Sequence, residues 1–194
     1  MSLNIVLCGV GGQGTVLASK LISAAAMQKG VAVKSAETIG MAQRGGSVFS
    51  HIRIGDDAFS PMIAEGEADL IIAFEPAEAV RMLTFLKEGG AVITSDRPVM
   101  PVTAALKGSD YNGVEMIDYM KSLDTIGKLL VVDTEKAVKD LGNPKAMNMV
   151  LLGAASRSGL LGDISYQEIV NAMRSKVKPQ FVDLNLKALE YVAV

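Results

Sequence analysis

The sequence predicts an α/β fold, a three-layer Rossmann-like sandwich with a mostly parallel, mixed central sheet. Short apolar runs that end at glycine alternate with segments whose apolar residues recur at helical spacing, as in β-α-β units. Hydrophobic residues make up 49% of the 194 residues and charged residues 21%, which suits buried strands covered by helices. No shift in composition marks a boundary, so residues 1–194 are expected to form a single domain.

The N-terminal segment predicts a strand, a glycine turn, a helix and a second strand. Ile5 to Cys8 is a short apolar run, and apolar residues then recur from Val16 to Ala25 with the spacing of a helix face. Lys29 and Gly30 provide a C-terminal stop, after which Val31 to Lys34 is extended. This β-α-β unit implies a parallel pair of strands.

The middle of the chain continues the α/β pattern and then loses it. Ser47 to Ile54 alternates between apolar and polar residues, which predicts a strand with one buried face. Asp69 to Phe74 predicts a core strand, Pro76 to Leu86 a helix, and Ala91 to Thr94 another strand. Arg97 to Lys128 contains prolines and glycines with weak periodicity, so we expect a long, irregular connection there.

The C-terminal third predicts one strand and several helices, each with a start signal. They are a strand at Leu129 to Val132, a short helix capped by Thr134, a helix opened by Asn143-Pro144, a helix with a capping box of Ser165 and Glu168 that runs through Arg174, and an amphipathic helix at Phe181 to Val192.

Composition excludes several classes of function. Nineteen basic residues against 21 acidic ones give a net charge of -2 without runs of like charge, so nucleic acid is not an expected partner. Cys8 is the only cysteine and His51 the only histidine, so the chain supplies neither four thiolates for an iron–sulfur cluster nor a zinc site. We expect His51 to have a structural or surface role. No apolar stretch reaches about 18 residues, and we expect a cytoplasmic protein with no membrane segment.

The first candidate site is the glycine-rich turn between the first strand and helix. It comprises Gly9, Gly11, Gly12, Gln13 and Gly14 and contains the pattern G-x-G-x-x-G, whose N–H groups and helix dipole favour a phosphate or another anion. In a dinucleotide site, Glu37 at the end of the second strand would hold the ribose hydroxyls. Alternatively, the glycines only allow the helix to pack tightly on the sheet.

The second candidate site is a polar, glycine-rich stretch that an ordinary Rossmann unit does not require. Together with Glu37, which precedes the stretch, it comprises Gln43, Arg44, Gly45, Gly46 and Ser47. Amide and guanidinium donors beside flexible glycines suit a carboxylate, a phosphate or the backbone of a partner. A solvated turn is the alternative. Neither candidate site contains an expected catalytic residue or metal ligand.

Taken in order, these segments resemble a known family. Gly9 to Gly14, Glu37 to Val48 and Ser50 to Gly55 resemble the gamma domain of pyruvate and 2-oxoacid:ferredoxin oxidoreductases. The resemblance extends over nearly the whole chain through Pro61, Gly66 to Asp69, Phe74 to Ala79 and Asn148 to Ala154. Within the family, Glu37 to Ser47 is most similar to the beta subunit of the indolepyruvate type.

The resemblance implies a subunit of a complex, inactive alone, that oxidatively decarboxylates 2-oxo acids. Thiamine diphosphate with magnesium attacks the 2-oxo acid, [4Fe-4S] clusters pass electrons to ferredoxin, and coenzyme A accepts the acyl group. This chain lacks the cysteines and the thiamine diphosphate motif, so large partner subunits would hold those cofactors. The two glycine-rich stretches are expected to lie near one another, shaping a partner interface or the entrance for coenzyme A. A stand-alone nucleotide-binding oxidoreductase and a non-catalytic scaffold are the alternatives.

Overall fold

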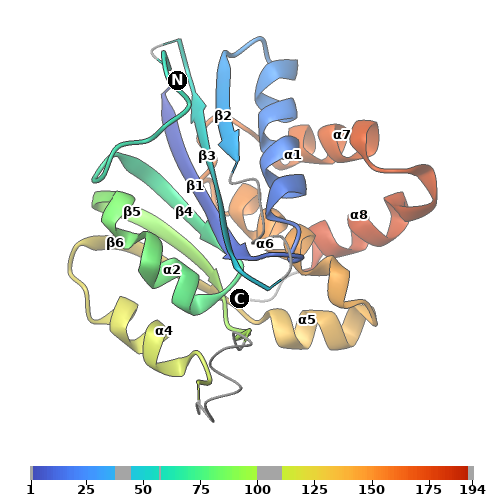
Figure 1. Ribbon diagram of the computed structural model, residues 1–194. Helices are drawn as coiled ribbons and strands as arrows, with labels where there is room; N and C mark the ends of the chain where they lie inside the picture. The colour runs from blue at the N-terminus through green and yellow to red at the C-terminus, as the bar shows by residue number, and fades with distance from the viewer. Residues whose placement is uncertain (1, 38–44, 57, 100–110, 192–194) are drawn as a thin grey trace.

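The described chain forms one six-stranded mixed sheet in the order β2-β3-β1-β4-β5-β6 (Figure 1). The computed structural model describes residues 2–37, 45–56, 58–99 and 111–191. The strands are β1 (Leu3–Val10), β2 (Val33–Glu37), β3 (Ser47–Ile54), β4 (Ala68–Ala73), β5 (Leu86–Ser95) and β6 (Ile126–Val132). β1, β4, β5 and β6 pair in parallel, and β3 is antiparallel to both of its neighbours. The predicted mostly parallel, mixed sheet is confirmed.

The predicted parallel pair of β1 and β2 is wrong in one respect. The two strands run in the same direction, but β3 lies between them and pairs with both. Ile52, for example, is opposite Ile5 on one side and Ser35 on the other. The periodicity of a strand specifies which side chains share a face but not which strand is its neighbour. β3 is also buried on both faces, because Ile52 and His51 on opposite faces are 0% and 1% exposed.

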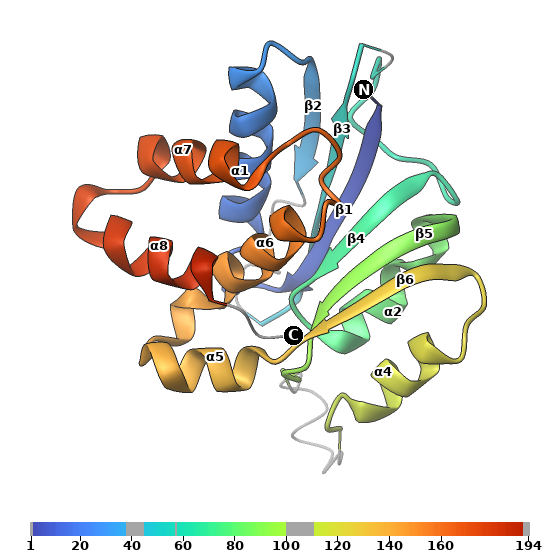
Figure 2. The same cartoon turned by 180° about the vertical axis from the view of Figure 1, so that it is seen from behind.

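Helices cover both faces of the sheet and complete the three layers (Figures 1 and 2). One face packs against α1 and α6, with α5, α7 and α8 outside them, and the other packs against α2 and α4. The helices are α1 (Thr15–Gln28), α2 (Pro76–Met82), α4 (Val114–Lys121), α5 (Thr134–Leu141), α6 (Met147–Arg157), α7 (Tyr166–Lys176) and α8 (Val182–Glu190). Short 3-10 turns are η2 (Leu83–Phe85), η3 (Pro144–Ala146) and η4 (Pro179–Phe181). Within the described ranges, no helix combines the length and the apolar character that crossing a membrane requires.

The expected irregular connection from Arg97 to Lys128 contains regular structure. Helix α4 occupies Val114–Lys121 within it, and β6 begins at Ile126 rather than at Leu129. Val114, Met116, Ile117 and Met120 of α4 are apolar, but the helix has only eight residues, so its period extends over little more than two turns. Residues 100–110 lie outside the described residues.

Several predicted helix boundaries are confirmed and two are wrong. Ser165 and Glu168 form the predicted capping box of α7. Asp133, not Thr134, caps α5, because the Thr134 hydroxyl is buried against Asp96 and Ser95 instead. The predicted helix through Leu86 ends earlier, since α2 stops at Met82 and Leu86 already belongs to β5.

The buried imidazole of His51 makes stability depend on pH. Its Nδ1 accepts a hydrogen bond of 3.1 Å from the amide of Ile63, and the rings of Phe49 and Phe85 contact it edge-on. Burial lowers the pKa of His51 below its ordinary value of 6.5. The unfolded chain therefore takes up this proton first, and the stabilisation is present above about pH 6.5 and lost as pH falls toward the folded-state pKa.

We expect His51→Gln, which keeps an acceptor for Ile63 but does not titrate, to flatten the fall in stability between pH 7 and pH 5. Urea unfolding of both proteins at several pH values measures this. Parallel curves for the two proteins would show that another group carries the dependence.

Candidate functional site

Three turns meet at the carboxyl edge of the parallel strands, where open α/β sheets bind their ligands. One follows β1 and comprises residues 11–14, the second precedes β3 and includes residues 45–46, and the third follows β5 at residues 96–99. The chain order of the sheet reverses between β1 and β4, which is the position at which such sheets bind their ligands. The site is therefore built from segments that are distant in sequence.

The structure brings the two glycine-rich stretches into direct contact. The amide of Gly11 donates to the carbonyl of Gly46 at 2.8 Å, and the amide of Gly45 donates to the carbonyl of Gly11 at 3.4 Å. These two bonds continue the antiparallel pairing of β1 and β3 beyond the strand ends. The predicted proximity of the two stretches follows from this pairing.

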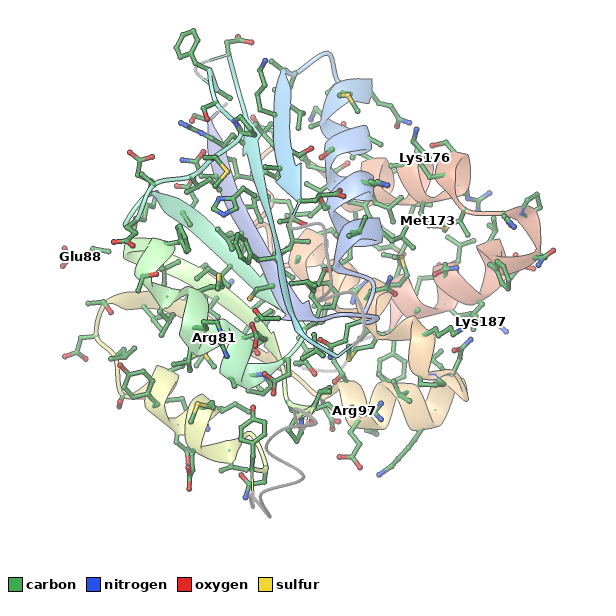
Figure 3. All side chains as sticks on the ribbon, in the orientation of Figure 1. Arg81, Glu88, Arg97, Met173, Lys176 and Lys187 are labelled. Atoms are coloured by element: carbon green, nitrogen blue, oxygen red, sulfur yellow. The ribbon has the colours of Figure 1, made fainter. Side chains whose placement is uncertain are left out.

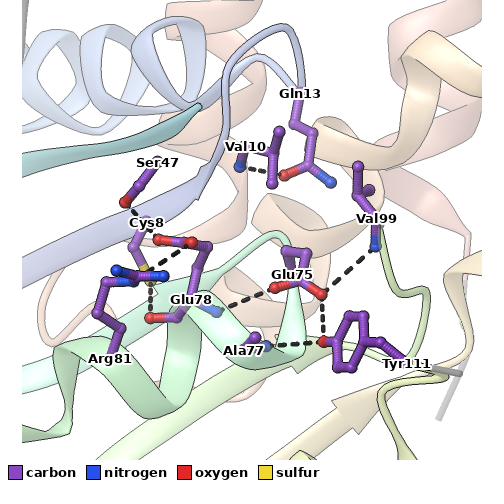
Figure 4. Close-up of polar contacts among 10 residues, drawn as sticks. All are labelled: Cys8, Val10, Gln13, Ser47, Glu75, Ala77, Glu78, Arg81, Val99 and Tyr111. Atoms are coloured by element: carbon purple, nitrogen blue, oxygen red, sulfur yellow. Dashed lines mark hydrogen bonds and ion pairs between the residues drawn. The ribbon is translucent and has the colours of Figure 1, made fainter. Parts of the chain in front are cut away.

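Gln13 holds the glycine turn against the sheet with both polar atoms of its side chain. Its Oε1 accepts from the amide of Val10 at 2.7 Å (Figure 4). Its Nε2 donates to the carbonyl of Phe74 at 2.9 Å. Gly9 allows this arrangement, because a Cβ atom there would lie 2.7 Å from Gln13 Oε1 and 2.9 Å from Phe74 Cβ. These two residues of the predicted site therefore serve its architecture.

A pocket of about 480 Å³ opens at the N-terminus of α1. Gly12 and Gly14 line one side, and Arg97 and Val99 after β5 line another. The amides of Gly12 and Gly14 donate no hydrogen bond to any residue that the structure describes. A helix of 14 residues with unsatisfied amides at its start favours an anion there.

Asn148 closes the pocket from α6, and its amide group is incompletely satisfied. The side chain is 5% exposed, and its Oδ1 accepts a 2.9 Å bond from the amide of Met149. That bond orients Nδ2 toward Gly14, where a Cβ atom would lie 2.4 Å from it. Nδ2 has no hydrogen-bond partner in the described part of the chain. Because Nδ2 is not a fully buried atom, it is open to the pocket, where an oxygen of a ligand could accept a hydrogen bond from it.

Two cationic side chains complete the pocket. Arg97 follows β5, and Lys145 lies in η3, just before α6. Figure 3 shows Arg97 beside α5, at the end of the molecule where the turns meet. Neither cation forms an ion pair with a described residue. Amide donors, an unpaired carboxamide and two cations together suit a phosphate group.

The remaining predicted site residues that the structure describes do not line this pocket. Glu37 ends β2, and β3 separates it from the glycine turn that follows β1, whereas a dinucleotide site places the acidic residue on the adjacent strand. Ser47 donates its hydroxyl to Glu78 Oε2 at 2.5 Å instead of facing the pocket. Gln43 and Arg44 lie outside the described residues.

A second polar cluster surrounds the first turn of α2, and it contains Cys8 (Figure 4). The thiol donates to the carbonyl of Glu78 at 3.4 Å, and Arg81 Nε lies 3.4 Å from Glu78 Oε1. Burial raises the pKa of Cys8, and the charges of Glu78 and Glu75 raise it further. A fully buried, protonated thiol is not a nucleophile. In the described ranges, no group of histidine, cysteine and acidic residues is arranged to hold a metal ion.

Sequence reasoning missed Asn148, Arg97 and Lys145 as site residues. Arg97 follows a strand, and its position at the carboxyl edge is a usable signal once the strand is recognised. Asn148 is a polar residue among apolar neighbours in α6, where ten of eleven residues are buried. Its approach to Gly14 is a tertiary contact that sequence spacing does not encode.

Comparisons with known proteins agree with this architecture. Residues 4–193 match the family model described as pyruvate ferredoxin/flavodoxin oxidoreductase. The chain is 40% identical over 187 residues to the indolepyruvate oxidoreductase subunit IorB of Pyrococcus horikoshii, covering 96% of this chain and 92% of that protein.

Two solved structures share the fold. One is the gamma subunit of a keto/oxoacid ferredoxin oxidoreductase from Geobacter sulfurreducens, with a TM-score of 0.68 and 24% identity over 97% of this chain and 94% of that one. The other is a 2-oxoglutarate:ferredoxin oxidoreductase from Magnetococcus marinus, solved with 2-oxoglutarate, coenzyme A and succinyl-CoA bound. It matches 97% of this chain but 30% of that one, with a TM-score of 0.67 and 20% identity. The chain therefore belongs to the pyruvate ferredoxin/flavodoxin oxidoreductase family, as a gamma-type subunit of a 2-oxoacid:ferredoxin oxidoreductase.

Proposed function

We propose that this subunit contributes the binding site for a phosphate group of coenzyme A to an enzyme that oxidises indolepyruvate or related aryl pyruvates to acyl-CoA. Ferredoxin is the electron acceptor in this proposal. The iron–sulfur clusters belong to large partner subunits, because this chain has one cysteine, and so do thiamine diphosphate and magnesium, because the chain lacks the Gly-Asp-Gly motif of their site. The subunit is inactive alone.

The observation that carries the coenzyme A assignment is the unpaired Nδ2 of Asn148. This amide lies at the wall of the pocket, open to it, and is directed toward Gly14 at the start of α1. Coenzyme A carries a pyrophosphate and a 3′-phosphate, each with several acceptor oxygens. A phosphate would satisfy the donors of Asn148, Gly12 and Gly14 together, and Arg97 would neutralise part of its charge.

The substrate assignment rests on the 40% identity to the indolepyruvate subunit of P. horikoshii. The pocket is lined by the apolar side chains of Leu17, Val99, Pro144 and Met147 as well as by amide groups and two cations, so its lining does not by itself select one 2-oxo acid. We therefore assign selection among 2-oxo acids to the partner subunits and recognition of coenzyme A to this chain. Loss of this subunit should impair the step that consumes coenzyme A.

We expect Arg97→Ala in the assembled enzyme to raise the apparent Michaelis constant for coenzyme A at least about tenfold, because a hydrogen bond to a charged group contributes about 1.5–3 kcal/mol. The turnover number at saturating coenzyme A and the Michaelis constant for the 2-oxo acid should change little. Steady-state kinetics with each substrate varied separately measures both effects.

The matched control is Arg174→Ala, which removes an exposed arginine of α7 outside the pocket. Asn148→Asp, nearly identical in shape, should raise the constant further, because it replaces a donor with a negative charge. Unchanged constants for coenzyme A in both Arg97→Ala and Asn148→Asp would refute the assignment.

A further inference from the structure

Glu75 is a buried carboxylate whose hydrogen bonds join three separate segments (Figure 4). It is 2% exposed and precedes α2, where its Oε2 accepts from the amide of Glu78 at 3.0 Å. Its Oε1 accepts from the hydroxyl of Tyr111 and, at 3.4 Å, from the amide of Val99. The Tyr111 oxygen in turn accepts from the amide of Ala77 at 3.1 Å. The Glu75 side chain thus caps α2 and also accepts hydrogen bonds from Val99 and Tyr111, which precede and follow residues 100–110 in the sequence.

These bonds reach the pocket through Val99. Val99 and Arg97 form the wall that follows β5, and Val99 is the residue that Glu75 contacts directly. The neighbouring carbonyl, that of Phe74, accepts from Gln13 and so holds the glycine turn on the opposite wall. The dipeptide Phe74-Glu75 is therefore connected to both walls of the pocket.

The choice of glutamate also points to more than helix capping. Serine, threonine, aspartate and asparagine are the preferred N-cap residues, and a shorter side chain would satisfy the amide of Glu78 alone. No lysine, arginine or histidine among the described residues forms an ion pair with Glu75. Hydrogen bonds alone compensate for the burial of the Glu75 carboxylate. If the residue served only to fill the core, an apolar side chain would give a more stable fold.

We propose that Glu75 is a positioning residue that fixes the Arg97–Val99 wall relative to the glycine turn. Its carboxylate accepts from Val99 and Tyr111 at one oxygen while the other oxygen caps α2. The kinetic consequence, weaker binding of coenzyme A when the wall is released, rests on the proposed function. The positioning of the wall by Glu75 does not depend on the proposed function.

The test compares Glu75→Gln and Tyr111→Phe with Glu168→Gln. Glutamine at position 75 keeps one acceptor for the amide of Glu78 but loses the second acceptor oxygen. Phenylalanine at position 111 removes only the hydroxyl and leaves the cap intact. Glu168 is a matched control, because it belongs to the capping box of α7 and lies outside the pocket.

Two readouts separate positioning from function. In the full chain, hydrogen exchange at Val99 should accelerate about tenfold or more in Glu75→Gln and less in Tyr111→Phe, but not in Glu168→Gln. In the assembled enzyme, the apparent Michaelis constant for coenzyme A should rise most in Glu75→Gln, less in Tyr111→Phe and not in Glu168→Gln. The turnover number should stay unchanged. Unchanged exchange at Val99 in both Glu75→Gln and Tyr111→Phe would overturn the proposal. Faster exchange with an unchanged Michaelis constant would support the positioning role and contradict the coenzyme A function.

Discussion

Replacement of Gly14 with alanine is expected to abolish productive binding in the pocket and to destabilise the chain by about 2–5 kcal/mol. Gly14 has φ +86°, a left-handed conformation that costs a residue with a side chain about 1–2 kcal/mol. The added Cβ would lie 2.4 Å from Asn148 Nδ2, so the amide must move away from the start of α1. Urea unfolding measures the first effect, and the Michaelis constant for coenzyme A in the assembled enzyme measures the second.

Gly159→Ala separates backbone strain from the clash with Asn148. Gly159 also has a positive φ, +75°, but its Cβ would meet open space, and the residue lies beyond the end of α6. We expect this variant to lose about 1–2 kcal/mol of stability without a change in the Michaelis constant. If Gly14→Ala behaved identically to Gly159→Ala in both measurements, the close contact with Asn148 would have no functional importance.

Gly153→Ala is expected to give the largest loss of stability without touching the pocket. Alanine normally favours a helix over glycine by about 1 kcal/mol. Here, however, the new Cβ would lie 2.2 Å from the carbonyl oxygen of Leu189 in α8, and backbone cannot rotate away as a side chain can. Displacing α8 would also break the bonds from Arg157 to the carbonyls of Leu189 and Tyr191.

We expect Gly153→Ala to lower the melting temperature by about 4–8 °C, which corresponds to about 2 kcal/mol for a chain of this size. Asn171→Ala, at an exposed position of α7, is the control in which alanine should leave stability unchanged or raise it. An increase in melting temperature for Gly153→Ala would mean that α6 and α8 do not pack as closely as the structure shows.

The layers of the fold were predictable because they depend on local pattern. Ile5 to Cys8 and Asp69 to Phe74 are apolar runs of strand length, and the capping box of Ser165 and Glu168 marks a helix start directly. The insertion of β3 between β1 and β2 was not predictable, because strand order is decided by long-range pairing. Helix α4 escaped prediction because it has only eight residues, too few turns for an apolar period to stand out among the surrounding prolines and glycines.

The candidate site was predictable only in part for the same reason. The glycine turn has a local signature, since positive φ values at Gly12 and Gly14 require glycine. Its role depends on Asn148 from α6 and Arg97 from the end of β5, which are far away in sequence. Sequence reasoning therefore located one wall of the pocket and missed the residues that give it its chemistry.

We expect this chain to be needed for the coenzyme A-dependent reaction of a larger enzyme. The most direct test is co-expression with the thiamine diphosphate subunit, followed by size-exclusion chromatography and 2-oxo-acid-dependent reduction of a dye, with and without this chain. We predict co-elution and turnover that responds to coenzyme A only when this chain is present. Separate elution, or full coenzyme A-dependent turnover by the partner alone, would contradict the account and leave a scaffold role instead.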